Sequence, residues 1–320
     1  MQLNEQAAAL TARLIAATRT LVGDDPAARF AVARFGVAVS GGPDSMALLC
    51  LAARAFPGRV AAVTIDHQLR AASADEAAMV ADWCATQSIP HAILTPDRPV
   101  DGNVHAWARA MRYRLIEQWR ASQGIDWIMT AHHADDQLET LMMRLNRGSG
   151  VAGLAGVRAR TGRVIRPLLG ERKAALEAFA HDQALPHVVD PSNADPRFDR
   201  AVMRAALAQA PWIDVQAGAR SAAALAEAEG AIAWSAAAMA VDHVRADGVG
   251  WRLDRTDLPR EYLRRLVLHM LEQADAPPPR GESLDRAIAL ALDGGQASLG
   301  DWLLKGGGAA WTLRPAPPRR

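Results

Sequence analysis

The sequence predicts a parallel α/β domain followed by a smaller, mainly helical C-terminal domain. Short apolar runs alternate with helical segments from residue 35 to about residue 145, which is the pattern of a parallel sheet with crossover helices. These runs carry no charge, as expected for strands that are buried on both faces of a sheet. From about residue 215 the chain becomes rich in alanine and keeps helical spacing. A chain of 320 residues is long enough for two domains.

The elements of the first domain follow in chain order. Residues 2–20 are rich in Ala and Leu at helical spacing, so a helix leads the chain, and Asp24-Asp25-Pro26 ends it. Four buried strands are expected at residues 35–39, 60–65, 92–94 and 127–130. Helices are expected beside them at residues 46–52, 73–88, 103–123 and from Asp135 onward.

The later segments contain a loop, further helices and a small hairpin. Residues 148–162 are rich in Gly and Arg and are expected to form a loop over the open end of the sheet. Helices are expected near 171–184, at 217–247 and at 260–273, and a hairpin at 299–313. We therefore expect a leading helix in residues 1–30, the α/β domain in 31–212 and the C-terminal domain in 213–320.

The composition excludes several classes of protein. Half of the residues are apolar and 22% are charged, so the chain can bury a large core and is not disordered as a whole. No run of about 18 uncharged apolar residues is present to span a membrane, and the first residues lack the features of a secretory signal. Two cysteines are too few for a disulfide scaffold. We therefore expect a cytoplasmic protein.

Arginine is concentrated in one part of a nearly neutral chain. The net charge is only +1, but residues 147–166 contain five arginines and no carboxylate. A local positive face of this kind suits a polyanionic partner such as a nucleic acid. A solvated surface would explain it equally well, so the charge alone leaves both interpretations open.

A loop rich in Ser and Gly connects the first strand to the helix after it. Ser40-Gly41-Gly42-Pro43-Asp44-Ser45 brings backbone N–H groups, two hydroxyls and a helix N-terminus together, which is an anion-binding arrangement. The loop lacks the lysine of the G-x-x-x-x-G-K-S/T phosphate loop, and the dinucleotide fingerprint G-x-G-x-x-G is also missing. The sequence therefore predicts phosphate binding by a different class of loop; a glycine-rich turn without a ligand is the alternative.

Two carboxylates, Asp136 and Glu139, lie three residues apart on a helix that follows a strand. They therefore share one face of that helix, at the carboxyl end of the sheet, where parallel α/β sheets place their ligands. Together with Asp44 they could share a Mg²⁺ ion that bridges the phosphates of ATP. Arg112 is suited to the same negative charge, or to a phosphate of a nucleic acid.

The histidines and cysteines do not form a recognisable metal site. His132 and His133 are adjacent, so their side chains diverge, and no third ligand is evident; polar packing near a nucleotide is favoured over metal binding. Cys50 and Cys84 fall on apolar helical segments and are expected to be core residues. No C-x-x-C motif is present to carry sulfur.

The loop from Ser40 to Ser45 resembles the pyrophosphate-binding loop of the N-type ATP pyrophosphatases, the PP-loop superfamily. From about Val37 to Arg204, seven further motifs resemble the tRNA(Ile)-lysidine synthase family in their order and spacing. They are Asp66-His67-Gln68-Leu69-Arg70, Ala108-Arg109-Ala110-Met111-Arg112-Tyr113, Ala131-His132-His133-Ala134-Asp135-Asp136-Gln137-Leu138-Glu139-Thr140, Arg147-Gly148-Ser149-Gly150, Gly153-Leu154-Ala155-Gly156, Arg166-Pro167-Leu168-Leu169 and Asp190-Pro191-Ser192-Asn193.

The resemblance implies the PP-loop ATP pyrophosphatase fold and a two-step ligase reaction with ATP and Mg²⁺. ATP adenylates O2 of the wobble cytidine of tRNA(Ile) with a CAU anticodon and releases diphosphate. The ε-amine of free L-lysine then attacks C2 and expels AMP, leaving lysidine. The amine must be neutral and close to C2, so Asp136 or Glu139 is expected to orient or deprotonate it. Asp44, Arg112, Asp136 and Glu139 are thus the expected catalytic residues, with Asp44 and Asp136 as metal ligands.

The resemblance also implies partners. The C-terminal domain and a set of arginines are expected to contact the tRNA, and a homodimer is possible. Arg200 and Arg204 form the last pair of these arginines. The family usually has Asn directly after the first of them, and this chain has Ala201 at that position. Longer members carry a further C-terminal domain, so this chain resembles the shorter form. The expected tRNA-binding arginines are Arg147, Arg158, Arg160, Arg163, Arg166, Arg200 and Arg204.

Two other functions are compatible with parts of the pattern. Another PP-loop tRNA-modifying enzyme, similar to a thiolase with an external sulfur source, would also adenylate a base; lysine-dependent release of AMP separates the two. A non-enzymatic module that binds nucleotide or tRNA would bind ATP without releasing diphosphate.

Overall fold

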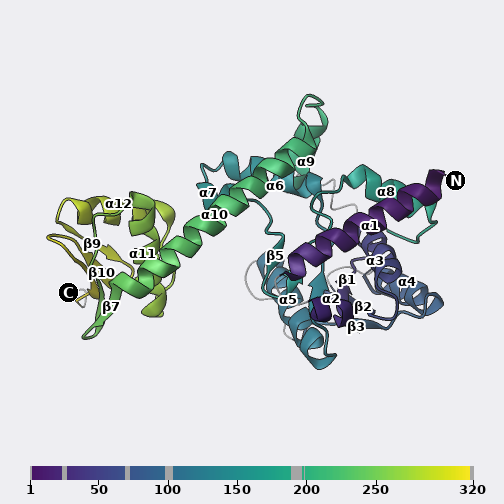
Figure 1. The fold of residues 1–320 in the computed structure, drawn as a ribbon, viewed down its shortest axis with the longest axis horizontal. Helices are drawn as coiled ribbons and strands as arrows, with labels where there is room; N and C mark the ends of the chain where they lie inside the picture. Colours follow the sequence, from purple (N-terminus) through teal and green to yellow (C-terminus); the bar gives the residue numbers. More distant parts are fainter. Residues whose placement is uncertain are drawn as a thin grey trace. The chain divides into compact units, whose positions relative to one another are not determined.

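The structure is a computed structural model that describes residues 2–23, 27–68, 73–97, 104–188, 197 and 199–317. Leu69, Arg70, the break at 24–26 and the motif at 190–193 lie outside the described residues. The chain divides into two compact units, Met1–Ala226 and Glu227–Arg320. The domain boundary expected near residue 212 therefore lies instead inside the long helix α10, Val215–His243 (Figure 1).

The first unit is built on a six-stranded sheet in the order β3-β2-β1-β4-β6-β5. The strands from β3 to β6 run parallel, and β5 pairs antiparallel to β6 at the edge. All four expected strands are confirmed, with bounds that differ by one residue or not at all. The strands are β1 (Phe35–Ala38), β2 (Val60–Ile65), β3 (His91–Leu94), β4 (Trp127–Met129), β5 (Arg160–Thr161) and β6 (Val164–Ile165).

Helices cover both faces of this sheet, which explains why its strands carry no charge. In β2, Val60 and Ala62 belong to the core formed with α1, α3, α4 and α8. Ala61 and Val63 face the opposite way and pack against α5. The helices of this unit are α1 (Gln2–Val22), α2 (Ala27–Val32), α3 (Pro43–Ala55), α4 (Ser73–Thr86), α5 (Val104–Ser122), α6 (Ala134–Leu145), α7 (Val151–Leu154), α8 (Lys173–Asp182), α9 (Asp199–Ala208) and the first part of α10.

The arginine-rich segment is more ordered than expected. Residues 148–162 were expected to form a loop, but they contain α7 and the strand β5, which pairs with β6 through the turn at Gly162. Gly162 has φ +55°, a backbone conformation that residues other than glycine rarely adopt. The strands β5 and β6 have two residues each, so their sequence has no periodicity to identify.

The second unit combines the end of α10 and the helices α11 and α12 with a five-stranded antiparallel sheet in the order β7-β8-β11-β10-β9. The expected helices and the antiparallel strands near the C-terminus are present, and two further strands, β7 and β8, were not expected. Val244–Asp247, expected at the end of a helix, forms β7, because Gly248 in the left-handed region turns the chain back into β8. The other elements are α11 (Arg260–Gln273), α12 (Gly281–Leu292), β8 (Gly250–Leu253), β9 (Gln296–Leu299), β10 (Trp302–Lys305) and β11 (Trp311–Pro315).

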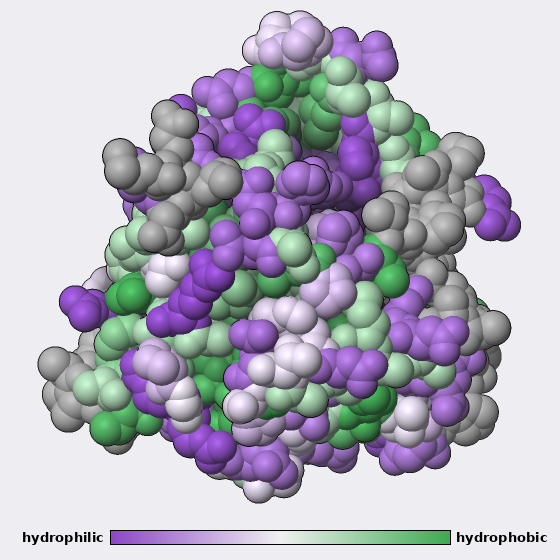
Figure 2. Space-filling view, turned by 90° about the vertical axis from the view of Figure 1, so that its right-hand side faces the viewer, coloured by the Kyte–Doolittle hydropathy of each residue, from purple (hydrophilic) through white to green (hydrophobic). Residues whose placement is uncertain are grey.

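No helix among the described residues is both long and apolar enough to cross a lipid bilayer. One face of the molecule is largely hydrophilic in its upper half, where polar side chains surround a recess (Figure 2).

Candidate active site

The Ser/Gly loop between β1 and α3 has the geometry of an anion site. Gly41 has φ +82°, and its carbonyl accepts a hydrogen bond from the N–H of Val188 (2.9 Å). The Ser45 hydroxyl accepts the N–H of Ser40 (3.2 Å) and donates to the carbonyl of Gly42 (2.9 Å). Gly42 caps α3 without a side chain, so the first N–H groups of this buried helix stay directed at the loop.

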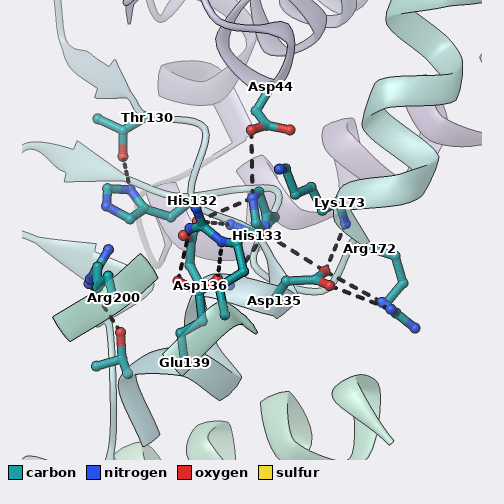
Figure 3. A network of polar contacts seen from close by, with 12 residues as sticks. Asp44, Thr130, His132, His133, Asp135, Asp136, Glu139, Arg172, Lys173 and Arg200 are labelled. Carbon is teal, nitrogen blue, oxygen red and sulfur yellow. Dashed lines mark hydrogen bonds and ion pairs between the residues drawn. The ribbon is translucent and has the colours of Figure 1, made fainter. Parts of the chain in front are cut away.

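The N-terminus of α6 brings a second carboxylate to the same place. His133 caps this helix, and its Nδ1 accepts the N–H of Asp136 (3.3 Å), while Asp136 Oδ2 accepts the N–H of His133 (3.1 Å). His133 Nε2 lies 3.7 Å from Asp44 Oδ2 and 3.5 Å from Asp136 Oδ2. The buried imidazole therefore lies between the two predicted carboxylates, from α3 and from α6 (Figure 3).

The negative charge around His133 acts on its pKa. Burial lowers the pKa of His133, but the carboxylates of Asp44, Asp136 and Asp135 outweigh burial, and the pKa is raised overall. The imidazole and the two flanking carboxylates thus form a compact polar centre at the carboxyl end of the sheet.

Glu139 lies one turn further along α6 and is held by an arginine. Its two carboxylate oxygens accept hydrogen bonds from Arg204 of α9 at 2.7 and 3.1 Å. The Glu139 side chain is 4% exposed and that of Arg204 is 36% exposed. Hydrogen bonding to Glu139 raises the pKa of Arg204 despite partial burial, and Asp136 and Asp44 add to this. Glu139 is therefore committed to an ion pair rather than open to a ligand.

Sequence reasoning did not identify Asp135, Arg172 or Lys173 as site residues. Asp135 Oδ2 accepts the N–H of Lys173, the first residue of α8, at 2.8 Å, and its oxygens lie 3.4 Å from the guanidinium of Arg172 (Figure 3). Ala134 also donates its N–H to the carbonyl of Glu171 (2.8 Å). The start of α8 is thus fixed against the start of α6. Two cations at a helix N-terminus oppose the helix dipole, which is the sequence signal that could have identified them.

Arg112, on α5, acts on His67, which follows β2, rather than on His133 in the carboxylate centre. Arg112 is exposed by its solvent-accessible area, but many protein atoms lie around its guanidinium. This partial burial lowers the pKa of Arg112. Arg112 in turn helps burial to lower the pKa of His67. Both ring nitrogens of His67 are buried without a hydrogen-bond partner among the described residues, and the ring lies 6.3 Å from that of Trp107.

His132, next to the polar centre, is surrounded mainly by positive charge. Its Nδ1 is 2.9 Å from the hydroxyl of Thr130. Burial is the main cause that lowers the pKa of His132 to about 4; Arg166, Arg200 and Arg109 contribute, and Asp136 opposes them. His132 is therefore neutral at pH 7, and polar packing is the role that its contacts describe.

The depressed pKa of His132 predicts a pH dependence of stability. An unfolded histidine titrates near 6.5, so between pH 6.5 and about 4 the unfolded chain binds one more proton at this position than the folded chain. The free energy of unfolding should fall by up to about 3 kcal/mol as the pH falls through this window. Urea unfolding at several pH values measures the free energy of unfolding of the wild type and of His132→Asn. The difference between the two free energies should become smaller by that amount at low pH. A constant difference between the two proteins across the window would contradict the prediction.

The arginines expected to form one cationic rim are not gathered in one place. Arg160 and Arg163 both lie over the ring of Trp127, the first residue of β4, at 4.5 and 5.0 Å from its centroid. They therefore lie towards the amino end of that strand, away from the phosphate loop. Arg166 is 6% exposed and donates to the carbonyl of Arg158 (2.7 Å), so it shapes the β5–β6 hairpin.

The other arginines of this set come from α6, α9 and the segments beside them. Arg147 is exposed and pairs with Asp199 at 2.6 Å. Arg200 is exposed and lies 3.3 Å from the hydroxyl of Thr140, close to His132 (Figure 3). Both side chains are accessible on the α6–α9 side of the site.

The residues at the polar centre fit a divalent cation only in combination with a ligand. Asp44 Oδ1 is buried and has no hydrogen-bond partner within the described part of the chain. In that same part of the chain no group of three or more His, Cys, Asp or Glu side chains could hold a metal ion alone. Asp44 and Asp136 match a Mg²⁺ site, because Mg²⁺ commonly takes one or two carboxylates and completes its shell with phosphate oxygens and water.

The two cysteines are core residues, as expected. Cys50 and Cys84 are free and buried. Burial raises the pKa of both thiols, that of Cys84 to about 11, so neither is a thiolate at pH 7.

Comparison with known proteins relates this geometry to a family. The PP-loop domain family matches residues 13–210. A tRNA(Ile)-lysidine synthase of Zymomonas mobilis is 41% identical, covering 90% of each chain, and one of Novosphingobium aromaticivorans is 40% identical with the same coverage. Among solved structures, the U34-tRNA thiolase NcsA of Methanococcus maripaludis is similar in fold, with a TM-score of 0.53 and 16% identity over 67% of this chain and 78% of that chain.

Proposed function

This chain belongs to the tRNA(Ile)-lysidine synthase family of PP-loop proteins, and from that membership we propose that it joins L-lysine to C2 of the wobble cytidine of tRNA(Ile) with a CAU anticodon. The reaction consumes ATP and yields lysidine, AMP and diphosphate. The observation that carries the proposal is the meeting of the Ser40–Ser45 loop and Asp136 at one polar centre, in a chain about 40% identical to its relatives.

In the first step, O2 of the cytidine attacks the α-phosphorus of ATP. The O2–P bond forms, the bond from the α-phosphorus to the oxygen bridging to the β-phosphate breaks, and diphosphate leaves with that electron pair. The Ser40–Ser45 loop and the N-terminus of α3 would bind the phosphates through N–H groups and hydroxyls. Arg112 would offset negative charge at the nucleotide or at a tRNA phosphate.

Asp44 and Asp136 would hold Mg²⁺ together with phosphate oxygens of the bound ATP. When bound, the ion would supply neutralising charge for the departing diphosphate. The buried, unpartnered oxygen of Asp44 supports this assignment. Glu139 is not part of the proposed ligand set, because Arg204 already occupies both of its oxygens.

In the second step, the ε-nitrogen of lysine attacks C2 of the adenylated cytidine. The N–C2 bond forms, the C2–O2 bond breaks, AMP leaves with O2, and the nitrogen loses a proton. Asp136, whose side chain is 15% exposed, is the better placed of the two candidate carboxylates to orient or deprotonate the amine. The Glu139–Arg204 pair would support Asp136 by fixing α6 against α9.

The tRNA contacts are proposed from exposure and charge. Arg147 and Arg200 are accessible beside the site, so they are the arginines of the predicted set that we assign to tRNA phosphates near the anticodon. Arg158, Arg160 and Arg163 would contact a more distant part of the tRNA. Arg166 and Arg204 act within the protein, through Arg158 and Glu139. We also propose that the C-terminal unit contacts the tRNA, that the protein is cytoplasmic and that it forms a homodimer.

Incubation of the protein with ATP, Mg²⁺, radiolabelled L-lysine and transcribed tRNA(Ile) with a CAU anticodon tests the function. Label should be retained on this tRNA and not on a methionine tRNA. Diphosphate release that depends on tRNA without retention of lysine would support the thiolase-like alternative, which the buried, protonated cysteines do not favour. ATP binding without diphosphate release, in folded protein, would support a binding module instead.

A further inference from the structure

We propose that Lys173 binds the β- and γ-phosphates of ATP and holds the diphosphate as it leaves. This inference rests on the proposed function, because it concerns the same nucleotide site. It adds a residue from α8, an element outside the Ser40–Ser45 loop and α6.

Lys173 lies within reach of the carboxylate centre. Contacts of 3.7, 3.8 and 2.8 Å connect Asp44 to His133, His133 to Asp135, and Asp135 to the backbone N–H of Lys173. The flexible four-carbon stem of lysine spans about 6 Å, so its ammonium can reach the space beside Asp44. Figure 3 shows the Lys173 side chain directed towards Asp44 and His133 rather than away from them.

The helix that carries Lys173 has a fixed orientation. Asp135 binds the Lys173 N–H and faces the Arg172 guanidinium, and Glu171 forms a bidentate pair with Arg13 of α1. Three contacts therefore hold the start of α8 against the site. They use the backbone of Lys173 and not its ammonium, so the side chain is presented by a rigid support.

Lys173 supplies a positive charge that the phosphate loop lacks. The Ser40–Ser45 loop contains no cation, and ATP places most of its negative charge on the β- and γ-phosphates. Lys173 is the only lysine in the first unit, and its side chain is 33% exposed. Its ammonium lies 3.2 Å from Glu177, an exposed i,i+4 pair that is weak enough to be exchanged for phosphate oxygens. Lys173 contributes charge and hydrogen bonds only.

The test is nucleotide binding without tRNA or lysine. Lys173→Met should raise the Kd for ATP and for diphosphate, each with Mg²⁺, about 10- to 100-fold, because each loses charge-assisted hydrogen bonds. The Kd for AMP, which lacks those phosphates, should change less than twofold. Lys173→Arg should recover part of the affinity. Lys305→Met, at the other lysine of the chain, is the matched control and should bind like the wild type.

A second measurement keeps the test valid if Lys173→Met folds poorly. In the wild-type protein, amine acetylation read by mass spectrometry should show that ATP and diphosphate protect Lys173, whereas AMP does not; Lys305 should react equally in all cases. Unchanged ATP affinity in a folded variant, or equal losses for ATP and AMP, would overturn the proposal. Failure of lysine transfer to tRNA with intact selectivity for ATP over AMP would count against the proposed function alone.

Discussion

Asp136→Asn should abolish lysine transfer, with a loss of about a thousand-fold in diphosphate release and in lysine incorporation. The asparagine keeps the size of the side chain and an oxygen that can accept the N–H of His133, so the cap of α6 should survive. What is lost is the negative charge beside His133 and Asp44. Losses of 10²- to 10⁴-fold are usual when a group that transfers a proton or stabilises charge in the transition state is removed.

The neighbouring carboxylate provides the matched control. Asp135→Asn removes the same charge one residue away, where the side chain binds the start of α8. We expect its activity to remain within about tenfold of the wild type, because an amide oxygen can still accept the Lys173 N–H. Single-turnover diphosphate release, with melting curves for both variants, makes the comparison. Equal losses of activity in the two variants would show that the total negative charge of this region, and not the position of Asp136, controls the reaction.

The fold of the first unit could be predicted because its strands have an unambiguous composition. β1 and β2 are uncharged over their whole length, since α3 and α5 bury opposite faces of the sheet. Val244–Asp247 was predicted wrongly, because valine and alanine fit a continuing helix as well as a strand. β5 and β6 were not predicted, because two-residue strands contain no repeat.

The site could be predicted only where topology alone decides it. Asp44 and Asp136 follow parallel strands, whose carboxyl ends share one edge of the sheet, so their proximity follows from the sequence. The pairing of Glu139 with Arg204 depends on how α9 packs against α6, and no pattern in either segment specifies it. The five arginines between 147 and 166 are close in sequence, but the β5–β6 hairpin separates their side chains in space.

Glu139→Gln should cost about 2–3 kcal/mol of unfolding free energy as well as activity. Breaking a buried ion pair costs about 3–5 kcal/mol, because the remaining charge loses its partner. We expect a smaller loss because Arg204 is 36% exposed and can be partly hydrated. Urea unfolding followed by circular dichroism measures the change, and the neutral Glu177→Gln on the exposed face of α8 should change it by less than about 0.5 kcal/mol.

Replacement of both partners separates the structural role of this pair from a chemical one. Glu139→Leu combined with Arg204→Met removes the buried charges together, and such replacements are often neutral or stabilising. If the pair serves only to hold α9 against α6, the double variant should recover both stability and activity. We expect recovered stability but a rate of lysine transfer that stays below that of the wild type, because Arg204 also interacts with Asp136 and Asp44. Full recovery of lysine transfer would show that the charge of Arg204 has no part in the site.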